Sequence, residues 1–268
     1  MKKLISIVAA GALLISASPY ANVDESPEAR GRSLMERLDA RDTDFDDAET
    51  IQLMILRNRQ GAESRKKMKT FSKMEENGDV KSLIIFQEPA DTKGTALLQH
   101  GYDDANKDDD MWLFLPALGK TKRISGSAQS GSFMGSEFSY EDLSMQGNID
   151  EADYKWLGEE VIDGVTYDIV EAYPHDTSTG YSKRKLWINE ELERMKKMEF
   201  YDRKKTLLKT MYLEDYQDFG DGNVRPMKIL MVNAQTGKET EMLNEYWKFD
   251  EGIDDKMFNK SQLKRLAR

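Results

Sequence analysis

Residues 206–249 read TLLKTMYLEDYQDFGDGNVRPMKILMVNAQTGKETEMLNEYWKF. Three runs rich in aromatic, branched and methionine side chains are separated here by two turn signals, Asp221-Gly222-Asn223 and Gln235-Thr236-Gly237. Strand-like runs joined by so few residues are typical of antiparallel hairpins. This stretch therefore predicts a β-meander.

The same rhythm extends over most of the chain. Residues 51–56 alternate with period two, and further strands are expected at 63–74, 80–88, 94–101, 111–116, 120–125, 153–160, 165–173, 183–189, 194–201, 206–217, 224–234 and 238–249. A sheet of about a dozen strands tends to curl, because twist accumulates and exposed edges are a liability. The expected fold is therefore mainly β with a few helices, a strongly curved antiparallel sheet or incomplete β-barrel.

Several of these strands carry apolar residues on both faces. In 183–189, Leu186 and Ile188 point to one face and Trp187 points to the other. A sheet with one face in water would alternate more cleanly, so we expect part of the outer face to be covered or used.

Two helical segments are expected to cover the sheet. Ser26-Pro27-Glu28 is typical of a helix start, with a capping hydroxyl, a proline at the first helical position and an acid in the first turn. Leu34, Met35 and Leu38 follow at helical spacing, which predicts an amphipathic lid helix near 27–40. The last residues, 257–266, are expected to form one more short helix or a docked tail.

The N-terminus has the pattern of an export signal. Lys2 and Lys3 precede the uncharged apolar run 4–17, which is shorter than the roughly 20 residues of a membrane-spanning helix. We therefore expect a signal peptide at 1–21 and one soluble periplasmic domain at 22–268. The signal carries two lysines and no acid, so its removal changes the net charge from −10 to −12.

The composition excludes several kinds of chemistry. The chain has no cysteine, and its two histidines, His100 and His175, lack the spacing of a metal motif. Ser130 and Ser132 do not fit the Gly-x-Ser-x-Gly nucleophile pattern. The acidic balance argues against a nucleic-acid partner, because phosphate binding needs a basic face. We expect no metal, no cofactor and no catalytic residue.

One segment breaks the strand rhythm. Residues 111–143 read MWLFLPALGKTKRISGSAQSGSFMGSEFSYEDL, a strand pair followed by a loop rich in glycine and serine. Loops this long within a compact domain are often lids or binding loops. Two interpretations stay open: a mobile flap with an apolar tip over a cavity, or a surface loop whose aromatic residues fill the core.

Six residues of this segment are the candidates for the cavity or its flap: Trp112, Phe114, Phe133, Met134, Phe138 and Tyr140. Strand alternation does not determine which face lines the cavity, so Leu113 and Leu115 are the mirror choice. Glu137, Glu141 and Asp142 are expected to be solvated acids that open a short helix.

A second charged stretch, residues 194–205 (RMKKMEFYDRKK), mixes bases with methionine and aromatic residues. Given the acidic net charge, we interpret this stretch as the charged outer face of neighbouring strands. Such a face could also dock an acidic partner or anionic headgroups.

The element SxxSGSFxGSEFSYEDL within 111–143 resembles the LolA-like family of outer-membrane lipoprotein-sorting proteins, and more closely its branch that accompanies RND/MMPL-type exporters. Lys93-Gly94-Thr95-Ala96 and the strand pair at 156–171 resemble the same branch. The resemblance covers about 28–265 and implies an open half-barrel of roughly eleven strands, with helices closing an apolar cavity.

The resemblance also implies a function. Members of the family carry acyl chains of lipids or lipoproteins across the periplasm without catalysis, so we expect a carrier in outer-membrane biogenesis. Its expected partners are acyl chains and an RND/MMPL-type inner-membrane exporter, with transient membrane contact. The alternative is a periplasmic adaptor or sensor of the same fold that binds a protein and keeps a filled core.

Overall fold

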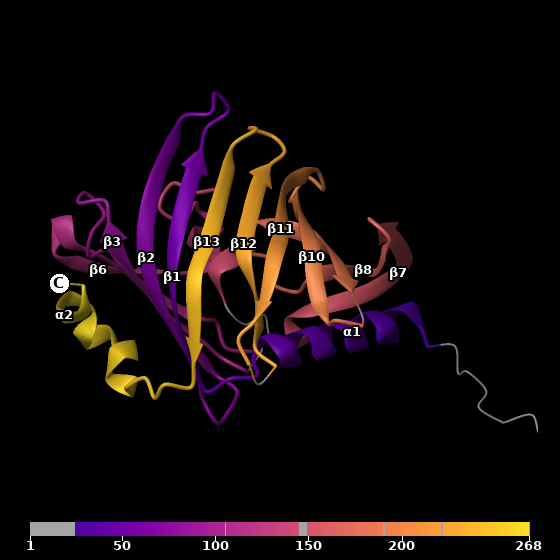
Figure 1. Ribbon diagram of the computed structural model, residues 1–268, viewed down its shortest axis with the longest axis horizontal. Helices are drawn as coiled ribbons and strands as arrows, with labels where there is room; N and C mark the ends of the chain where they lie inside the picture. Colours follow the sequence, from indigo (N-terminus) through magenta and orange to yellow (C-terminus); the bar gives the residue numbers. More distant parts are fainter. Residues whose placement is uncertain (1–24, 105, 145–148, 190, 221, 268) are drawn as a thin grey trace, which may run out of the picture.

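The computed structural model describes residues 25–104, 106–144, 149–189, 191–220 and 222–267 (Figure 1). The signal peptide expected at 1–21 lies outside these residues. The described chain forms one antiparallel sheet of thirteen strands, whose bounds are β1 (Asp47–Arg57), β2 (Glu63–Met74), β3 (Val80–Glu88), β4 (Ala96–Gly101), β5 (Asp110–Leu115), β6 (Lys120–Ile124), β7 (Ala152–Ile162), β8 (Val165–Pro174), β9 (Tyr181–Asn189), β10 (Arg194–Asp202), β11 (Leu207–Asp218), β12 (Val224–Asn233) and β13 (Glu239–Phe249).

The sheet is built outward from its centre. The order is β6-β5-β4-β3-β2-β1-β13-β12-β11-β10-β9-β8-β7, so the first and last strands pair in the middle and β6 and β7 form the two edges. The predictions of a mainly β fold and an open, incomplete barrel are confirmed. The count is thirteen strands, where the family resemblance implied about eleven.

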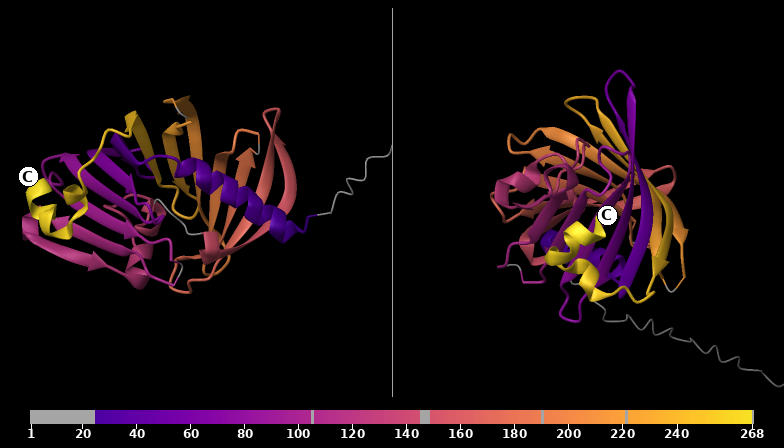
Figure 2. Two further views of the ribbon diagram at one scale, coloured as in Figure 1. Left: turned by 90° about the horizontal axis from the view of Figure 1, so that it is seen from below. Right: turned by 90° about the vertical axis from the view of Figure 1, so that its left-hand side faces the viewer.

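The sheet curves strongly, as Figures 1 and 2 show from three sides. Register shifts occur between Ile51 and Gln52 in β1, between Lys67 and Met68 in β2, and between Trp156 and Gly158 in β7. Such bulges bend a strand and increase its twist, which lets a long sheet wrap around its own concave face.

Helix α1 (Pro27–Asp42) confirms the predicted first helix. The Ser26 hydroxyl accepts a hydrogen bond from the backbone N–H of Ala29 at 3.1 Å and caps its start. Leu34 and Leu38 are buried against β7, β8 and β9, and Met35 packs partly against the same group. We call this group, whose sheet members include Val170, Leu186 and Ile188, the α1 cluster.

The chain end covers part of the outer face. The short helices η5 (Asp255–Phe258), η6 (Lys260–Gln262) and α2 (Leu263–Leu266) lie over β2–β5. Phe258 and Leu263 are buried there with Leu83 and Leu98. We call residues 253–267 the C-terminal segment. Its docking confirms the expected tail and explains why strands on this side are apolar on both faces.

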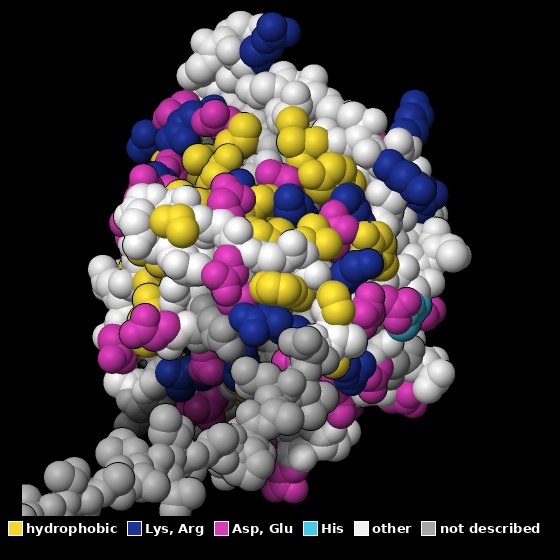
Figure 3. Space-filling view, turned by 90° about the vertical axis from the view of Figure 1, so that its right-hand side faces the viewer, with side chains coloured by type: hydrophobic (Ala, Val, Ile, Leu, Met, Phe, Trp, Pro, Cys, Tyr) yellow, Lys and Arg dark blue, Asp and Glu magenta, His cyan; other side chains and the backbone are white. Residues whose placement is uncertain are grey.

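The remaining outer face carries both charges. Lys197 Nζ lies 3.7 Å from Glu199 Oε1 and 3.7 Å from the ring centre of Trp187, and Lys183 pairs with Glu171. Figure 3, which faces the β7 side of the molecule, shows hydrophobic side chains interspersed with acids and bases instead of one apolar patch. None of the helices among the described residues combines the length and hydropathy needed to cross a membrane.

Candidate functional site

Residues 125–144, here called the crossing loop, run over the concave face of the sheet. Because β6 and β7 are opposite edges, the chain that joins them has to cross the open side. The crossing loop contains the short helices η2 (Gly126–Ser130) and η3 (Glu141–Leu143), and η4 (Ile149–Glu151) leads into β7. Between η2 and η3, Ser132 and Ser139 form a β-bridge.

The crossing loop places two phenylalanines in the middle of the concave face. Phe133 is 0% exposed and Phe138 is 3% exposed. The ring centres of Phe133 and Phe86 are 5.6 Å apart, and those of Phe133 and Tyr140 are also 5.6 Å apart. The buried group around these rings, here called the concave cluster, consists of Met54, Met68, Ile84, Phe86, Leu97, Met111, Leu113, Phe133, Phe138, Tyr181, Phe200, Met231 and Met242.

The concave cluster draws on both halves of the sheet, since its members come from β1–β5 and from β9, β10, β12 and β13. The crossing loop therefore packs against both halves of the sheet, which also pair with each other at β1 and β13. Of the two interpretations of the loop, the structure describes the second, in which aromatic residues of the loop fill the core. Met134 and Tyr140 are partly buried and pack against the same cluster.

An ion pair holds the end of the crossing loop. Lys209 of β11 donates to the Asp142 carboxylate, and their side chains are only 5% and 2% exposed. The Tyr181 hydroxyl donates to Asp142 Oδ1 at 2.6 Å, and the backbone N–H of Ser139 donates to Asp142 Oδ2 at 2.6 Å. Burial, followed by the charge and hydrogen bond of Asp142, raises the pKa of Tyr181 well above its ordinary value.

Two further acids fix the crossing loop to neighbouring strands. The backbone N–H of Glu137 donates to Thr240 Oγ1 at 2.9 Å, and Asn233 Nδ2 donates to Glu137 Oε2 at 2.7 Å. Thr179 donates its hydroxyl to Glu141 Oε2 at 2.6 Å. We call the three carboxylates Glu137, Glu141 and Asp142, together with these partners and with Lys209 and Tyr181, the latch.

The latch corrects the prediction that these acids are solvated. Glu141 and Asp142 do open the short helix η3, but the carboxylate of Asp142 is buried against Lys209. Sequence reasoning missed Lys209 and Tyr181 entirely. The signal that could have found Lys209 is a lone lysine in the apolar run of 206–213, a position that requires a buried acid as partner.

The structure divides the six candidate residues between the two faces. Trp112 and Phe114 of β5 pack with the C-terminal segment, and Phe114 is 5% exposed there. Leu113 and Leu115, the mirror choice, face the concave cluster together with Phe133 and Phe138. Both faces of β5 are apolar, so alternation alone gave no sign of which side the chain end covers.

The lid helix residues Leu34, Met35 and Leu38 belong to the α1 cluster, which adjoins the concave cluster because Met198 packs against both. Arg30 of α1 donates to Asp168 Oδ1 at 2.9 Å, and Trp156 Nε1 donates to the same oxygen at 2.7 Å. Gly31 allows the close approach of α1, because a Cβ there would lie 2.8 Å from the backbone nitrogen of Trp156. This dense contact ties α1 to β7 and β8.

Two serine hydroxyls of the crossing loop make structural hydrogen bonds within the loop. The Ser132 hydroxyl donates to the carbonyl of Ser136 at 2.6 Å, and the Ser130 hydroxyl donates to the carbonyl of Ser127 at 2.8 Å. Within the described ranges, no group of three or more His, Cys, Asp or Glu side chains is spaced to hold a metal ion. The main feature of the arrangement is the apolar concave face.

The solved structures that are similar to this chain include three with at least 26% sequence identity. A Vibrio parahaemolyticus domain assigned to outer membrane lipoprotein sorting is 39% identical, with a TM-score of 0.84, over 88% of this chain and 99% of its own. A DUF1329 family protein from Desulfovibrio piger is 33% identical, with a TM-score of 0.84, over 89% and 99%. A LolA superfamily protein from Nitrosomonas europaea is 26% identical, with a TM-score of 0.70, over 86% and 98%.

Comparison at the sequence level gives less functional detail. A family model described as "Uncharacterized protein" matches residues 78–265, which is more than half of the chain. None of the curated proteins gives a significant match.

Proposed function

This chain belongs to the LolA-like family of outer-membrane lipoprotein-sorting proteins, and from that premise we propose that it is a periplasmic carrier of lipid or lipoprotein acyl chains. The observation that carries the proposal is the concave cluster. It is an apolar sheet face whose cover is a loop rich in glycine and serine, instead of a second layer of strands.

In this proposal an acyl chain takes the place of Phe133 and Phe138. Each methylene buried contributes about 0.8 kcal/mol, whereas each phenylalanine ring that leaves the cluster costs about 2–3 kcal/mol. An acyl chain must therefore bury several methylenes before the free energy gained offsets the cost of displacing the two rings. This competition keeps the affinity moderate, which lets a carrier release its cargo.

The latch gives the crossing loop two states, closed over the concave face and lifted away from it. In the closed state Lys209 and Asp142 compensate each other's charge within the apolar face. When the crossing loop lifts, both charges return to water, so neither is left buried and unpaired. A partner that binds the open state better shifts the population toward it and thereby loads or unloads the carrier.

The proposed partner is an RND/MMPL-type inner-membrane exporter, which rests on the family resemblance of the 111–143 segment. Transient contact with that exporter or with the membrane would supply the signal for opening. The carrier cycle contains no covalent step, and we assign no catalytic residue, metal or cofactor to it.

A disulfide that closes the crossing loop tests the proposal. Positions 137 and 240 adjoin, with Glu137 N and Thr240 Oγ1 2.9 Å apart, and the chain has no native cysteine. We expect oxidised Glu137→Cys/Thr240→Cys protein to bind a dansyl-labelled undecanoic acid roughly tenfold more weakly than the same protein after reduction. The matched control is Ser132→Cys/Ser139→Cys, which ties the loop to itself at its β-bridge and leaves it free of the sheet.

Two results would overturn the carrier proposal. The first is equal binding by the oxidised and reduced forms, which would mean that the probe binds elsewhere. The second is the absence of any bound or transferable lipid when protein purified from its own periplasm is analysed by native mass spectrometry and lipid extraction.

The alternative function is an adaptor or sensor that binds a protein partner. The observation that favours it is the complete burial of Phe133, because a core filled by its own side chains needs no cargo. An adaptor of this kind would bind no fatty acid in either redox state of the cysteine pair. It would also keep its protein partner when the crossing loop is locked.

A further inference from the structure

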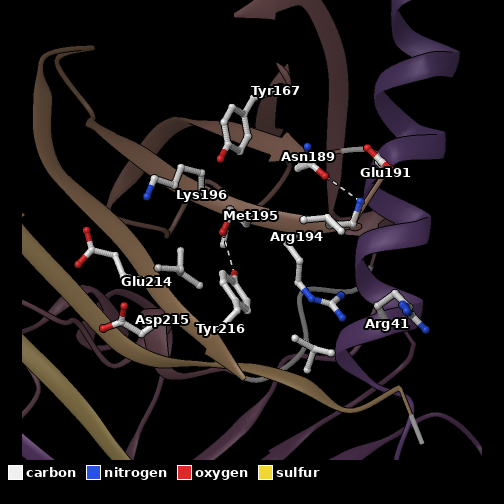
Figure 4. A pocket seen from close by; sticks show the side chains of 13 residues that line it. Arg41, Tyr167, Asn189, Glu191, Arg194, Met195, Lys196, Glu214, Asp215 and Tyr216 are labelled. Atoms are coloured by element: carbon white, nitrogen blue, oxygen red, sulfur yellow. Dashed lines mark hydrogen bonds between the residues drawn. The ribbon is translucent and has the colours of Figure 1, made fainter. Parts of the chain in front are cut away.

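A cleft opens in the sheet where β10 and β11 separate. The two strands pair from Tyr201↔Leu207 to Lys197↔Tyr212, and beyond that point no pairing joins them among the described residues. The cleft has a volume of about 670 Å3 and lies between 194–196 of β10 and 213–216 of β11, with Arg41 of α1 at one end (Figure 4). This size is within the range of small-molecule sites.

The cleft is held open by local structure. The Tyr216 hydroxyl donates to the carbonyl of Met195 at 2.7 Å and replaces the missing ladder bonds with one long-range contact. Asp215 has a left-handed φ of 56°, which interrupts the regular extension of β11. The separation of the strands is therefore built into the fold at these two residues.

Four charged side chains in the cleft have no ion pair among the residues that the structure describes. Two are cations, Arg194 and Lys196, and two are anions, Glu191 and Asp215. Their charged neighbours are already used, since Arg41 pairs with Glu193, and Glu214 pairs with Lys228. Arg194 Nη1 donates to the carbonyl of Glu193 at 3.0 Å, and its charge opposes the rise that burial causes in the pKa of Asp42. Charges of both signs that face one cleft without a salt bridge favour a ligand that itself carries both signs.

The cleft is also joined to apolar surface on the concave side. Met195 lines the cleft and packs against the α1 cluster, to which Leu34 and Leu38 belong. Its neighbour Met198 packs against both the α1 cluster and the concave cluster. A molecule with a charged head in the cleft could thus lay an apolar tail along the inside of the sheet.

We propose that this cleft binds the zwitterionic headgroup of a phospholipid, with the phosphate at Arg194 and Lys196 and the ammonium at Asp215 and Glu191. Guanidinium and ammonium groups make strong charge-assisted hydrogen bonds to phosphate oxygens, and carboxylates do so with an ammonium. The position of the tail rests on the proposed carrier function, whereas the headgroup site stands on the cleft alone. The basic stretch 194–205 thus contributes two of its bases to a defined site.

The test uses the full-length mature protein and three soluble probes measured by calorimetry and by NMR. These are glycerophosphoethanolamine, which has no acyl chain, dihexanoyl phosphatidylethanolamine, and dihexanoyl phosphatidylglycerol, which keeps the phosphate but has no ammonium.

We expect Arg194→Gln/Lys196→Gln to weaken the binding of all three probes by roughly tenfold or more. We expect Glu191→Gln/Asp215→Asn to weaken the two ethanolamine probes and to leave the glycerol lipid bound as well or better. Asparagine suits position 215 because it tolerates a left-handed backbone.

The matched control is Lys204→Gln/Lys238→Gln, which removes two exposed lysines outside the cleft and should change no affinity beyond twofold. A thermal unfolding midpoint equal to that of the unmodified protein shows that each variant is folded. The headgroup proposal is overturned if glycerophosphoethanolamine does not perturb the cleft resonances, or if both charge variants weaken the two lipids alike. Headgroup binding at the cleft without any fatty-acid binding would instead overturn the carrier proposal and leave the headgroup site standing.

Discussion

The crossing loop and the C-terminal segment cover opposite faces of the sheet, and each does so with a buried phenylalanine. The crossing loop packs on both halves of the sheet, whereas the C-terminal segment packs on β2–β5 only. Phe133 of the crossing loop is 0% exposed and Phe258 of the C-terminal segment is 2% exposed. The apolar contribution of each cover is thus similar, and the difference between them lies in what fixes their polar groups.

The C-terminal segment is fixed mainly through its backbone. The Asp47 carboxylate accepts the N–H group of Ile253 at 2.8 Å, and also those of Glu251 and Gly252, just before the segment, at 3.1 and 3.0 Å. His100 Nε2 lies 2.8 Å from the carbonyl oxygen of Phe258. These bonds use backbone N–H and C=O groups of the segment. If the segment left the sheet, each of these groups would have to form a new hydrogen bond with water.

The crossing loop is fixed mainly through acidic side chains that reach across to β9, β11 and β12. One backbone bond adds to them, from the N–H of Glu137 to Thr240 Oγ1 of β13. Side-chain bonds can be exchanged for water or for a ligand without unfolding a strand. Under the proposed function, the C-terminal segment is a permanent cover of the core and the crossing loop is a removable one. If this distinction holds, changes to the permanent cover should cost more stability than changes to the removable one.

Replacing the phenylalanine of the permanent cover should cost the most stability. We expect Phe258→Ala to lower the free energy of unfolding by about 3–5 kcal/mol, because it leaves a cavity among Leu83, Leu98 and Phe114. Denaturant unfolding measures this change. Fatty-acid affinity should stay the same, and a parallel loss of affinity would mean that the two faces are coupled.

Breaking the ion pair of the latch should have the next largest effect. We expect Asp142→Ala to cost about 2–3 kcal/mol, less than the most severe cases, because the loop can lift and rehydrate Lys209. Limited proteolysis should cut the crossing loop faster in this variant. The double variant Asp142→Leu/Lys209→Met removes both charges and should recover most of the lost stability; if it does not, the pair has no special role in holding the loop.

Shortening the phenylalanine of the removable cover should cost less than shortening Phe258. We expect Phe133→Ala to lower the free energy of unfolding by about 1–2 kcal/mol, since an open loop avoids part of the cavity cost. Fatty-acid binding should tighten, because the probe then displaces less apolar surface of the protein. Equal stability losses in Phe133→Ala and Phe258→Ala would show that both covers are permanent.

The smallest expected effect is a pH dependence on the side of the crossing loop. Partial desolvation of its carboxyl group, with the like charges of Asp109 and Asp176, raises the pKa of Glu151 to about 7, above its ordinary value of 4.5. As the pH rises through about 5 to 7, the unfolded chain has already released this proton while the folded protein still holds it, so stability falls. Above about 7 the loss levels off.

Thermal unfolding across this pH range measures the effect, and Glu151→Gln should flatten the curve. The C-terminal segment should show no change there, because Lys73 lowers the pKa of Asp255 below its ordinary value of 3.8 and its titration lies at more acid pH. A slope that persists in Glu151→Gln would assign the effect to other groups, such as Asp39, whose pKa burial raises to about 6.

Local chemistry made much of the fold predictable. The strand expected at 80–88 is β3 (Val80–Glu88), and the strand expected at 224–234 is β12 (Val224–Asn233). The helix expected at 27–40 ends two residues later, at Asp42. Turn residues, period-two alternation and capping hydroxyls act over a few residues, so their signals can be read directly from the sequence.

The candidate site was predictable only in part. The crossing loop was found because its small residues and aromatics break the strand rhythm, and Phe133 and Phe138 do lie at the centre of the concave face. The face of Trp112 and Phe114 could not be read, because a segment almost 150 residues further along the chain covers it. The burial of Asp142 was missed because its partner Lys209 is 67 residues away.

The sequence by itself determined the strands, their turns, the start of α1 and the absence of cysteine chemistry, since each depends on neighbouring residues. Only the tertiary structure decided that β1 pairs with β13, that the link from β6 to β7 must cross the concave face, and that β10 and β11 part to form a cleft. These features depend on pairings between distant segments. Which side chains are buried and which charges are paired in these features is decided only when distant segments come together in the curved sheet.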